Sequence, residues 1–69
     1  MENKMLNLLH RLAAHIATDL LTTTHETGDF SPFIRVCEDL YEVDTILRVN
    51  GIEPDGDIAL VVKKAFIDT

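Results

Sequence analysis

The stretch MLNLLHRLAAHIATDLL, residues 5–21, decides the fold of this chain, because its apolar residues recur at helical spacing. One face of the predicted helix carries Met5, Leu9, Leu12, Ala13, Ile16 and Leu20. The opposite face carries Lys4, Asn7, Arg11, His15, Thr18 and Thr22. This separation predicts an amphipathic helix over about residues 2–22. The three threonines at 22–24 favour its end there, since β-branching lowers helix propensity.

The apolar arc of this first helix is wider than one neighbouring helix can cover. Leu6, Ala17 and Leu21 extend one flank, and Leu8 extends the other beside Asp19. The cover could come from two neighbours within the chain or from a second subunit. A chain of 69 residues has little else to offer, so we expect a second subunit. The predicted dimer or partner interface is Leu6, Leu8, Leu9, Leu12, Ile16 and Leu20.

A second helix is predicted from Ser31-Pro32 to about Asn50. Serine is a good N-cap, proline suits the first helical position, and Gly51 stands where a C′ glycine ends a helix. Asp44 and Arg48 form an i,i+4 pair beside the charged face. The predicted core stripe is Phe33, Val36, Cys37, Leu40, Val43 and Leu47. Four apolar residues lie off that stripe and again favour a partner: Ile34, Tyr41, Ile46 and Val49.

The third segment, residues 57–67, follows a turn at Pro54 and Gly56 and is capped by Asp55 or Asp57. A helix would gather Ile58, Val61, Val62, Ala65 and Phe66 on one face. The isoleucine and valines also favour a strand, but a lone strand would lack a pairing edge. We therefore expect a helix. The predicted architecture is all-α over 1–69: a long N-terminal helix antiparallel to a second, a short third helix, and dimerisation into a helical bundle.

Composition limits the classes of partner. The chain has 46% hydrophobic residues and one cysteine, which excludes an intrachain disulfide and leaves self-association as a source of stability. Its net charge of −6 disfavours direct nucleic-acid binding and anionic membrane surfaces. A helix-turn-helix interpretation has only Lys63 and Lys64 in its favour. Without a signal peptide or membrane span in the sequence, we expect a cytoplasmic protein.

No motif indicates catalysis, a cofactor or a metal. His15 and Asp19 have i,i+4 spacing, but a metal site needs more ligands. Cys37 falls in a core stripe, where a thiol is unreactive. His25 lies near Glu26 and Asp29 in what reads as a polar loop. The stretch 53–57 lacks the closing glutamate of a calcium loop. We therefore expect a non-enzymatic protein.

The acidic residues are concentrated between positions 26 and 57, where nine of them face two arginines and give a net charge of −7. An ordinary solvated surface explains this, yet such a field can also steer a basic partner. The leading hypothesis is a small protein-binding regulator or accessory subunit acting through an apolar helical interface. The alternative is an acidic inhibitor that imitates nucleic acid towards a basic protein. Its candidate acidic face is Glu38, Asp39, Glu42, Glu53, Asp55 and Asp57.

Overall fold

The computed structural model describes residues 3–24 and 29–67, and the regular structure of these residues is helical throughout. The elements are α1 (Lys4–Thr24), the 3-10 turn η1 (Ser31–Phe33), α2 (Ile34–Val49), α3 (Gly56–Val62) and the π-helical turn η2 (Lys63–Ile67). The all-α prediction is confirmed, and the third segment is helical rather than a strand. The predicted loop at residues 25–28 lies outside the described residues.

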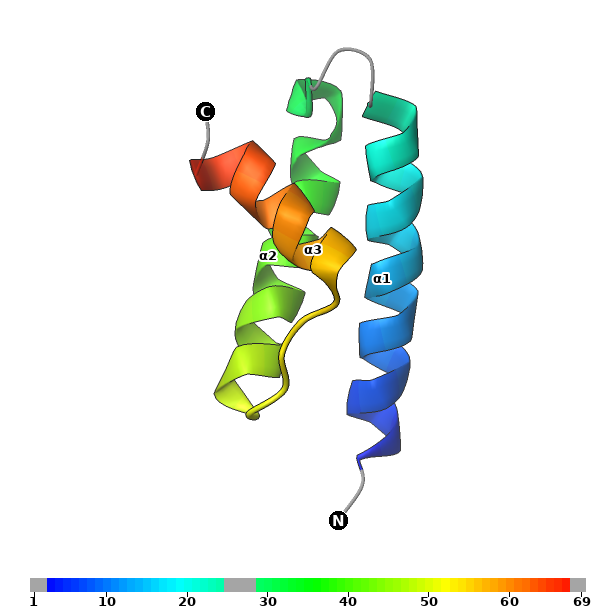
Figure 1. Ribbon diagram of the computed structural model, residues 1–69, viewed down its shortest axis with the longest axis vertical. Helices are drawn as coiled ribbons and strands as arrows, with labels where there is room; N and C mark the ends of the chain where they lie inside the picture. The colour runs from blue at the N-terminus through cyan, green and yellow to red at the C-terminus, as the bar shows by residue number, and fades with distance from the viewer. Residues whose placement is uncertain (1–2, 25–28, 68–69) are drawn as a thin grey trace.

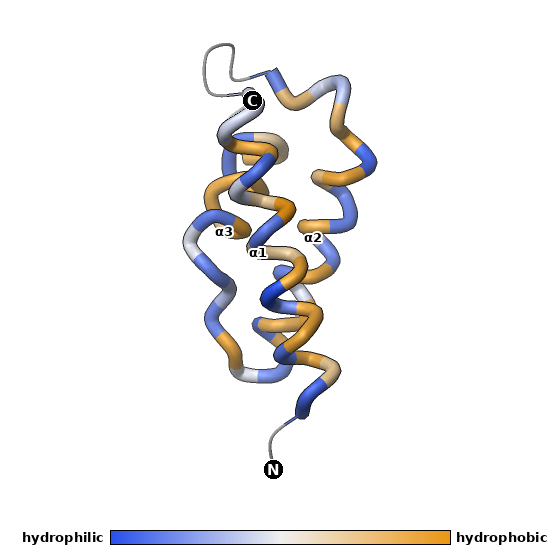
Figure 2. The backbone as a smooth tube through the Cα atoms, turned by 90° about the vertical axis from the view of Figure 1, so that its right-hand side faces the viewer, coloured by the Kyte–Doolittle hydropathy of each residue, from blue (hydrophilic) through white to orange (hydrophobic). Residues whose placement is uncertain are grey.

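The helix α1 runs antiparallel to α2, and α3 crosses both of them (Figure 1). Viewed with α1 in front, α3 and α2 lie on either side of it (Figure 2). The short α3 therefore covers one side of the α1–α2 pair.

The ends of α1 are set by side chains that bond to the backbone. Asn3 caps the start, because its Oδ1 accepts a 3.0 Å hydrogen bond from the N–H of Leu6. The helix ends at Thr24, within the run of threonines where its end was predicted. The hydroxyls of Thr22, Thr23 and Thr24 each donate to the carbonyl four residues earlier, at 2.9–3.0 Å. These bonds satisfy the threonine hydroxyls within the helix, although threonine has a low helix propensity.

The start of α2 also differs from the prediction. Ser31 does not cap it but opens η1, and the α-helix begins at Ile34. The carboxylate of Asp29 accepts a 2.9 Å hydrogen bond from the Ser31 N–H, which forms an Asx turn before η1. The N-cap positions of η1 and α2 are Phe30 and Phe33, and neither start has a side-chain cap. Pro32 lies within the first turn, as predicted.

The chain leaves α2 through a left-handed glycine. Gly51 has φ +73°, and its N–H donates to the carbonyl of Arg48. The N–H of Ile52 donates to the carbonyl of Leu47 at 2.8 Å, which completes a Schellman motif. Asp55 then caps α3 by accepting from the N–H of Asp57 at 2.9 Å. The predicted C′ glycine and N-cap aspartate are both confirmed.

The core lies where the three helices meet, and α1 enters it with only part of the predicted face. Ala13 and Leu20 of that face are buried and Leu9 is half-buried, whereas Met5, Leu12 and Ile16 are exposed. The buried face is rotated toward the flank that carries Ala17. The buried cluster is Ala13, Ala17, Leu20, Phe30, Cys37, Leu40, Leu47, Ile58 and Val61.

Candidate functional site

Large aliphatic side chains of α1 remain exposed after the chain has folded. The relative exposure is 83% for Met5, 47% for Leu8, 53% for Leu12 and 48% for Ile16. Steps of three and four residues separate them, so they form one continuous line along the helix. We call these four residues the open stripe. Hydrophobic segments recur along the whole of α1 in Figure 2.

The open stripe lies on the side of α1 away from α3. The α3 side is marked by His10 and Thr18, which hydrogen-bond to Asp55 and Asp57. Leu12 lies two residues after His10, and Ile16 lies two residues before Thr18. A step of two residues is about 200° around the helix. The stripe is thus uncovered because the short α3 occupies the other side of the helix pair.

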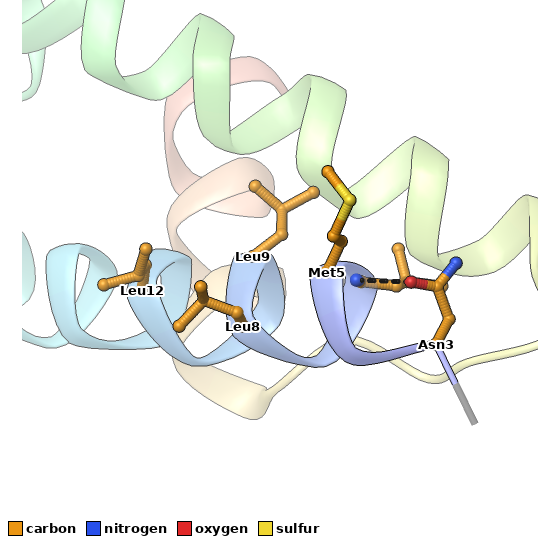
Figure 3. Close-up of a pocket in the computed structure, with 6 residues that line it drawn as sticks. Asn3, Met5, Leu8, Leu9 and Leu12 are labelled. Carbon is orange, nitrogen blue, oxygen red and sulfur yellow. Dashed lines mark hydrogen bonds between the residues drawn. The ribbon is translucent and has the colours of Figure 1, made fainter.

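The N-terminal part of the stripe borders an open groove of about 480 Å³. Its walls are almost entirely apolar. In Figure 3, Met5 and Leu9 project toward α2, while Leu8 and Leu12 stand on the near surface of α1. The residues lining it are Asn3, Met5, Leu6, Leu8, Leu9 and Leu12.

The helix α2 continues this apolar surface beside the groove. Its α3 side is marked by Tyr41, whose ring meets that of Phe66 edge-on at 5.5 Å. Val43 follows two residues later, about 200° around the helix, and packs against the core while half-buried. Ile46 lies one turn further along the same side and is 43% exposed. Both helices therefore present aliphatic side chains to the face that α3 leaves open.

The outer edges of this face carry opposite charges. On α1, Leu8 shares a shallow depression with Lys4, Asn7 and Arg11. On α2, Asp39 and Glu42 are exposed and flank Ile46 by helical spacing. The apolar surface thus lies between a basic edge on one helix and an acidic edge on the other.

The six predicted interface residues do not share one environment. Leu8, Leu12 and Ile16 are exposed, and Leu9 is half-buried in the wall of the groove. Leu6 packs against the core, and Leu20 is a core residue at 6% exposure. Ile46 and Val49, which lie off the predicted core stripe of α2, are 43% and 81% exposed.

The predicted acidic residues do not share one environment. Glu38, Asp39, Glu42, Glu53 and Asp55 are exposed. Asp57 is half-buried, and its Oδ2 accepts a 2.5 Å hydrogen bond from the hydroxyl of Thr18. The start of α3 is therefore held against α1, whereas Glu38, Asp39 and Glu42 project from α2.

The other polar residues considered from the sequence are either exposed on the surface or buried. His15 and Asp19 are both exposed, and within residues 3–24 and 29–67 no cluster of three metal-ligating side chains exists. Cys37 is fully buried, and this burial raises the pKa of its thiol. Asp44 is buried rather than on the charged face; its Oδ1 accepts from Arg48 Nε at 2.7 Å, which raises the pKa of the guanidinium.

Sequence reasoning missed the role of His10. Its Nε2 accepts a 2.9 Å hydrogen bond from the backbone N–H of Asp55, which lies 45 residues away. The helical pattern places His10 beside the buried face, but no sequence signal pairs it with the turn before α3.

Comparison with known proteins finds no matching family, no similar curated protein and no similar solved structure. Among the described residues, no helix combines the length and the apolar character needed to cross a bilayer. The open face between α1 and α2 is therefore the feature from which a function can be argued.

Proposed function

We propose that this chain is a non-enzymatic protein-binding module, a small regulator or accessory subunit that buries its open stripe in a helical interface. The observation that carries the proposal is the continuous exposure of Met5, Leu8, Leu12 and Ile16 on one side of α1. We place the interaction in the cytoplasm, with which the unpaired Cys37 is compatible.

The continuity of the apolar surface supports this proposal. Four aliphatic side chains on one side of α1 are 47–83% exposed, and Ile46 on α2 is 43% exposed. Contiguous apolar patches mark interaction sites more often than scattered surface leucines do. Leucine and isoleucine at 47–53% exposure also sit on a rigid helix, which keeps the entropic cost of binding low.

A second copy of the chain is the partner that we propose first. The open face belongs to a two-helix layer, so another two-helix layer would complete a bundle around it. Small domains commonly gain stability in this way, because a short chain buries a low fraction of its surface.

The acidic inhibitor remains the alternative, and it has less support. Asp57 is half-buried and bonded to Thr18, so it contributes little to a surface that imitates phosphates. What favours it is the exposed group on α2, Glu38, Asp39 and Glu42. A complex of that kind would weaken sharply between low and high salt, whereas an apolar interface would not.

Sedimentation of the purified protein between about 1 and 500 µM, a span that reaches the Kd of weak dimers, tests the proposal. We expect a dimer that the double substitution Leu12→Glu with Ile16→Glu converts to a monomer. Val49→Glu is the matched control, because Val49 is 81% exposed on the side of α2 next to Ile67. Circular dichroism should show all three proteins folded, since the substituted side chains are already solvent-accessible.

Two results together would refute the module. The first is a wild-type monomer across the whole concentration range. The second comes from photo-crosslinking at position 8 in the cells that produce the protein. It is that the wild type and the double variant Leu12→Glu with Ile16→Glu capture the same proteins.

A further inference from the structure

We infer that the open stripe of one copy is covered by α2 of a second copy, about a two-fold axis parallel to the helices. This inference rests on the proposed function and assigns both the occupant and its orientation. In this arrangement each α1 lies across an antiparallel α2 of the partner. Both copies use the same surface, as a two-fold interface requires.

Aliphatic side chains stand on both sides of the proposed contact. The partner's Ile46 and half-buried Val43 supply the aliphatic side chains that face the stripe.

The order of charges along the two helices sets the orientation. From its N-terminal end, α1 carries Lys4 and Arg11 and then Asp19 beside the stripe. Because α2 is antiparallel, the same end of the molecule is its C-terminal end. From there α2 carries Glu42 and Asp39 and then Arg35.

A two-fold axis parallel to the helices keeps the ends of both copies together. It therefore brings the edge of α1 that carries Arg11 toward the edge of the partner's α2 that carries Glu42, and Asp19 to the end that carries Arg35. Complementary edges of this kind fix orientation more than they add affinity.

The other two-fold arrangement pairs α1 with α1. Its axis would pass near the middle of the stripe, which spans Met5 to Ile16, and so would place Arg11 against Arg11 of the partner subunit. Like charges that meet at an interface are unfavourable. The charge pattern therefore selects α2 as the cover.

Charge reversal on one helix tests this orientation. Lys4→Glu with Arg11→Glu makes the basic edge of α1 acidic, so that it meets the acidic edge of the partner's α2, and we expect about a tenfold rise in the dimer Kd at low salt. Adding Asp39→Lys and Glu42→Lys to the same chain restores opposite charges on both edges and should return the Kd to within about twofold of wild type.

The matched control is Lys63→Glu with Lys64→Glu. It changes the net charge by the same amount at exposed positions near the end of the chain, away from the open face. We expect this control to change the Kd much less than the α1 reversal, and urea unfolding of each variant checks that the fold is retained.

Three results would overturn the inference. The first is that the charge reversal on α1 leaves the dimer Kd at the value of the lysine control. The second is that the variant with all four substitutions does not return to the wild-type Kd. Either result would show that the α1–α2 orientation is wrong, while the binding module stands. The wild type could also be a monomer whose crosslinks from position 8 capture another protein, and lose that protein when Leu12 is substituted. The proposal that a second copy is the partner would then be wrong, while the binding module would again stand.

Discussion

The imidazole of His10 accepts a 2.9 Å hydrogen bond from the backbone N–H of Asp55, the residue whose own carboxylate caps α3. One half-buried side chain in the middle of α1 therefore fixes where the third helix begins. The Thr18–Asp57 bond lies two turns further along α1 and holds the same end of α3. Together they attach the shortest helix to the longest.

His10→Leu should lower the free energy of unfolding by about 0.5–1.5 kcal/mol, because the Asp55 N–H exchanges its imidazole acceptor for water. Urea unfolding measures the change. His10→Gln retains an acceptor and should lose less, and His15→Leu, at an exposed position, should stay within about 0.5 kcal/mol of wild type. Equal effects at positions 10 and 15 would show that the bond contributes nothing.

Gly51→Ala should destabilise the protein by about 1 kcal/mol, since φ +73° is unfavourable for a residue with a Cβ atom. No atom lies within 4 Å of the added Cβ, so the cost is backbone strain alone. Gly56→Ala is the contrasting variant: its φ is ordinary and its surroundings are equally open. It should be neutral or stabilising by up to about 1 kcal/mol. Thermal unfolding of the two variants checks the opposite signs.

Acidification should weaken the fold partly through Asp29. The backbone N–H of Ser31 holds the pKa of this carboxyl below its ordinary value of 3.8. A lowered pKa in the folded state contributes stability above the unfolded-state pKa, and that contribution is lost as pH falls through the folded value. Asp29→Asn keeps an acceptor but cannot ionise, so its melting temperature should fall less between pH 6 and about pH 3. An identical pH profile in both proteins would contradict this.

Cys37 should resist thiol reagents in the native protein. The side chain is fully buried, and its raised thiol pKa leaves less of the reactive thiolate. Labelling should be at least about a hundredfold slower than in urea, because modification has to wait for opening of the core. Val36→Cys in a Cys37→Ala background supplies a half-buried thiol one residue away for comparison. Equal native rates at the two positions would place Cys37 at the surface.

The sequence predicted those parts of the fold that depend on local chemistry. Gly51 and Asp55 could be assigned because a left-handed C′ position and an N-cap each require a particular residue type. Part of the core face of α2 was also predictable, since Cys37, Leu40 and Leu47 repeat at helical spacing and are all buried. In both cases a single residue, or a single spacing, carries the information.

The face of α1 that enters the core could not be predicted in the same way. Its apolar arc is wide enough to satisfy several rotations, and close packing at Ala13 and Ala17 decides between them. The contact between His10 and Asp55 spans 45 residues and depends on how α3 crosses, which no periodicity encodes. Leu8, Leu12 and Ile16 of the predicted interface are exposed, whereas Met5 was missed and Leu20 lies in the core, because the sequence does not fix that rotation.

The rotation of α1 has a consequence for how the stability of a dimer would depend on protein concentration. Ala13 and Ala17 are buried while Met5, Leu8, Leu12 and Ile16 are 47–83% exposed, so a solitary molecule leaves about half or more of each of these four residues uncovered. If pairing supplies the missing burial, the melting temperature rises with protein concentration by mass action. At low expression the chain would unfold and be degraded more readily. The steady-state amount of the protein would then rise more than in proportion to its rate of synthesis.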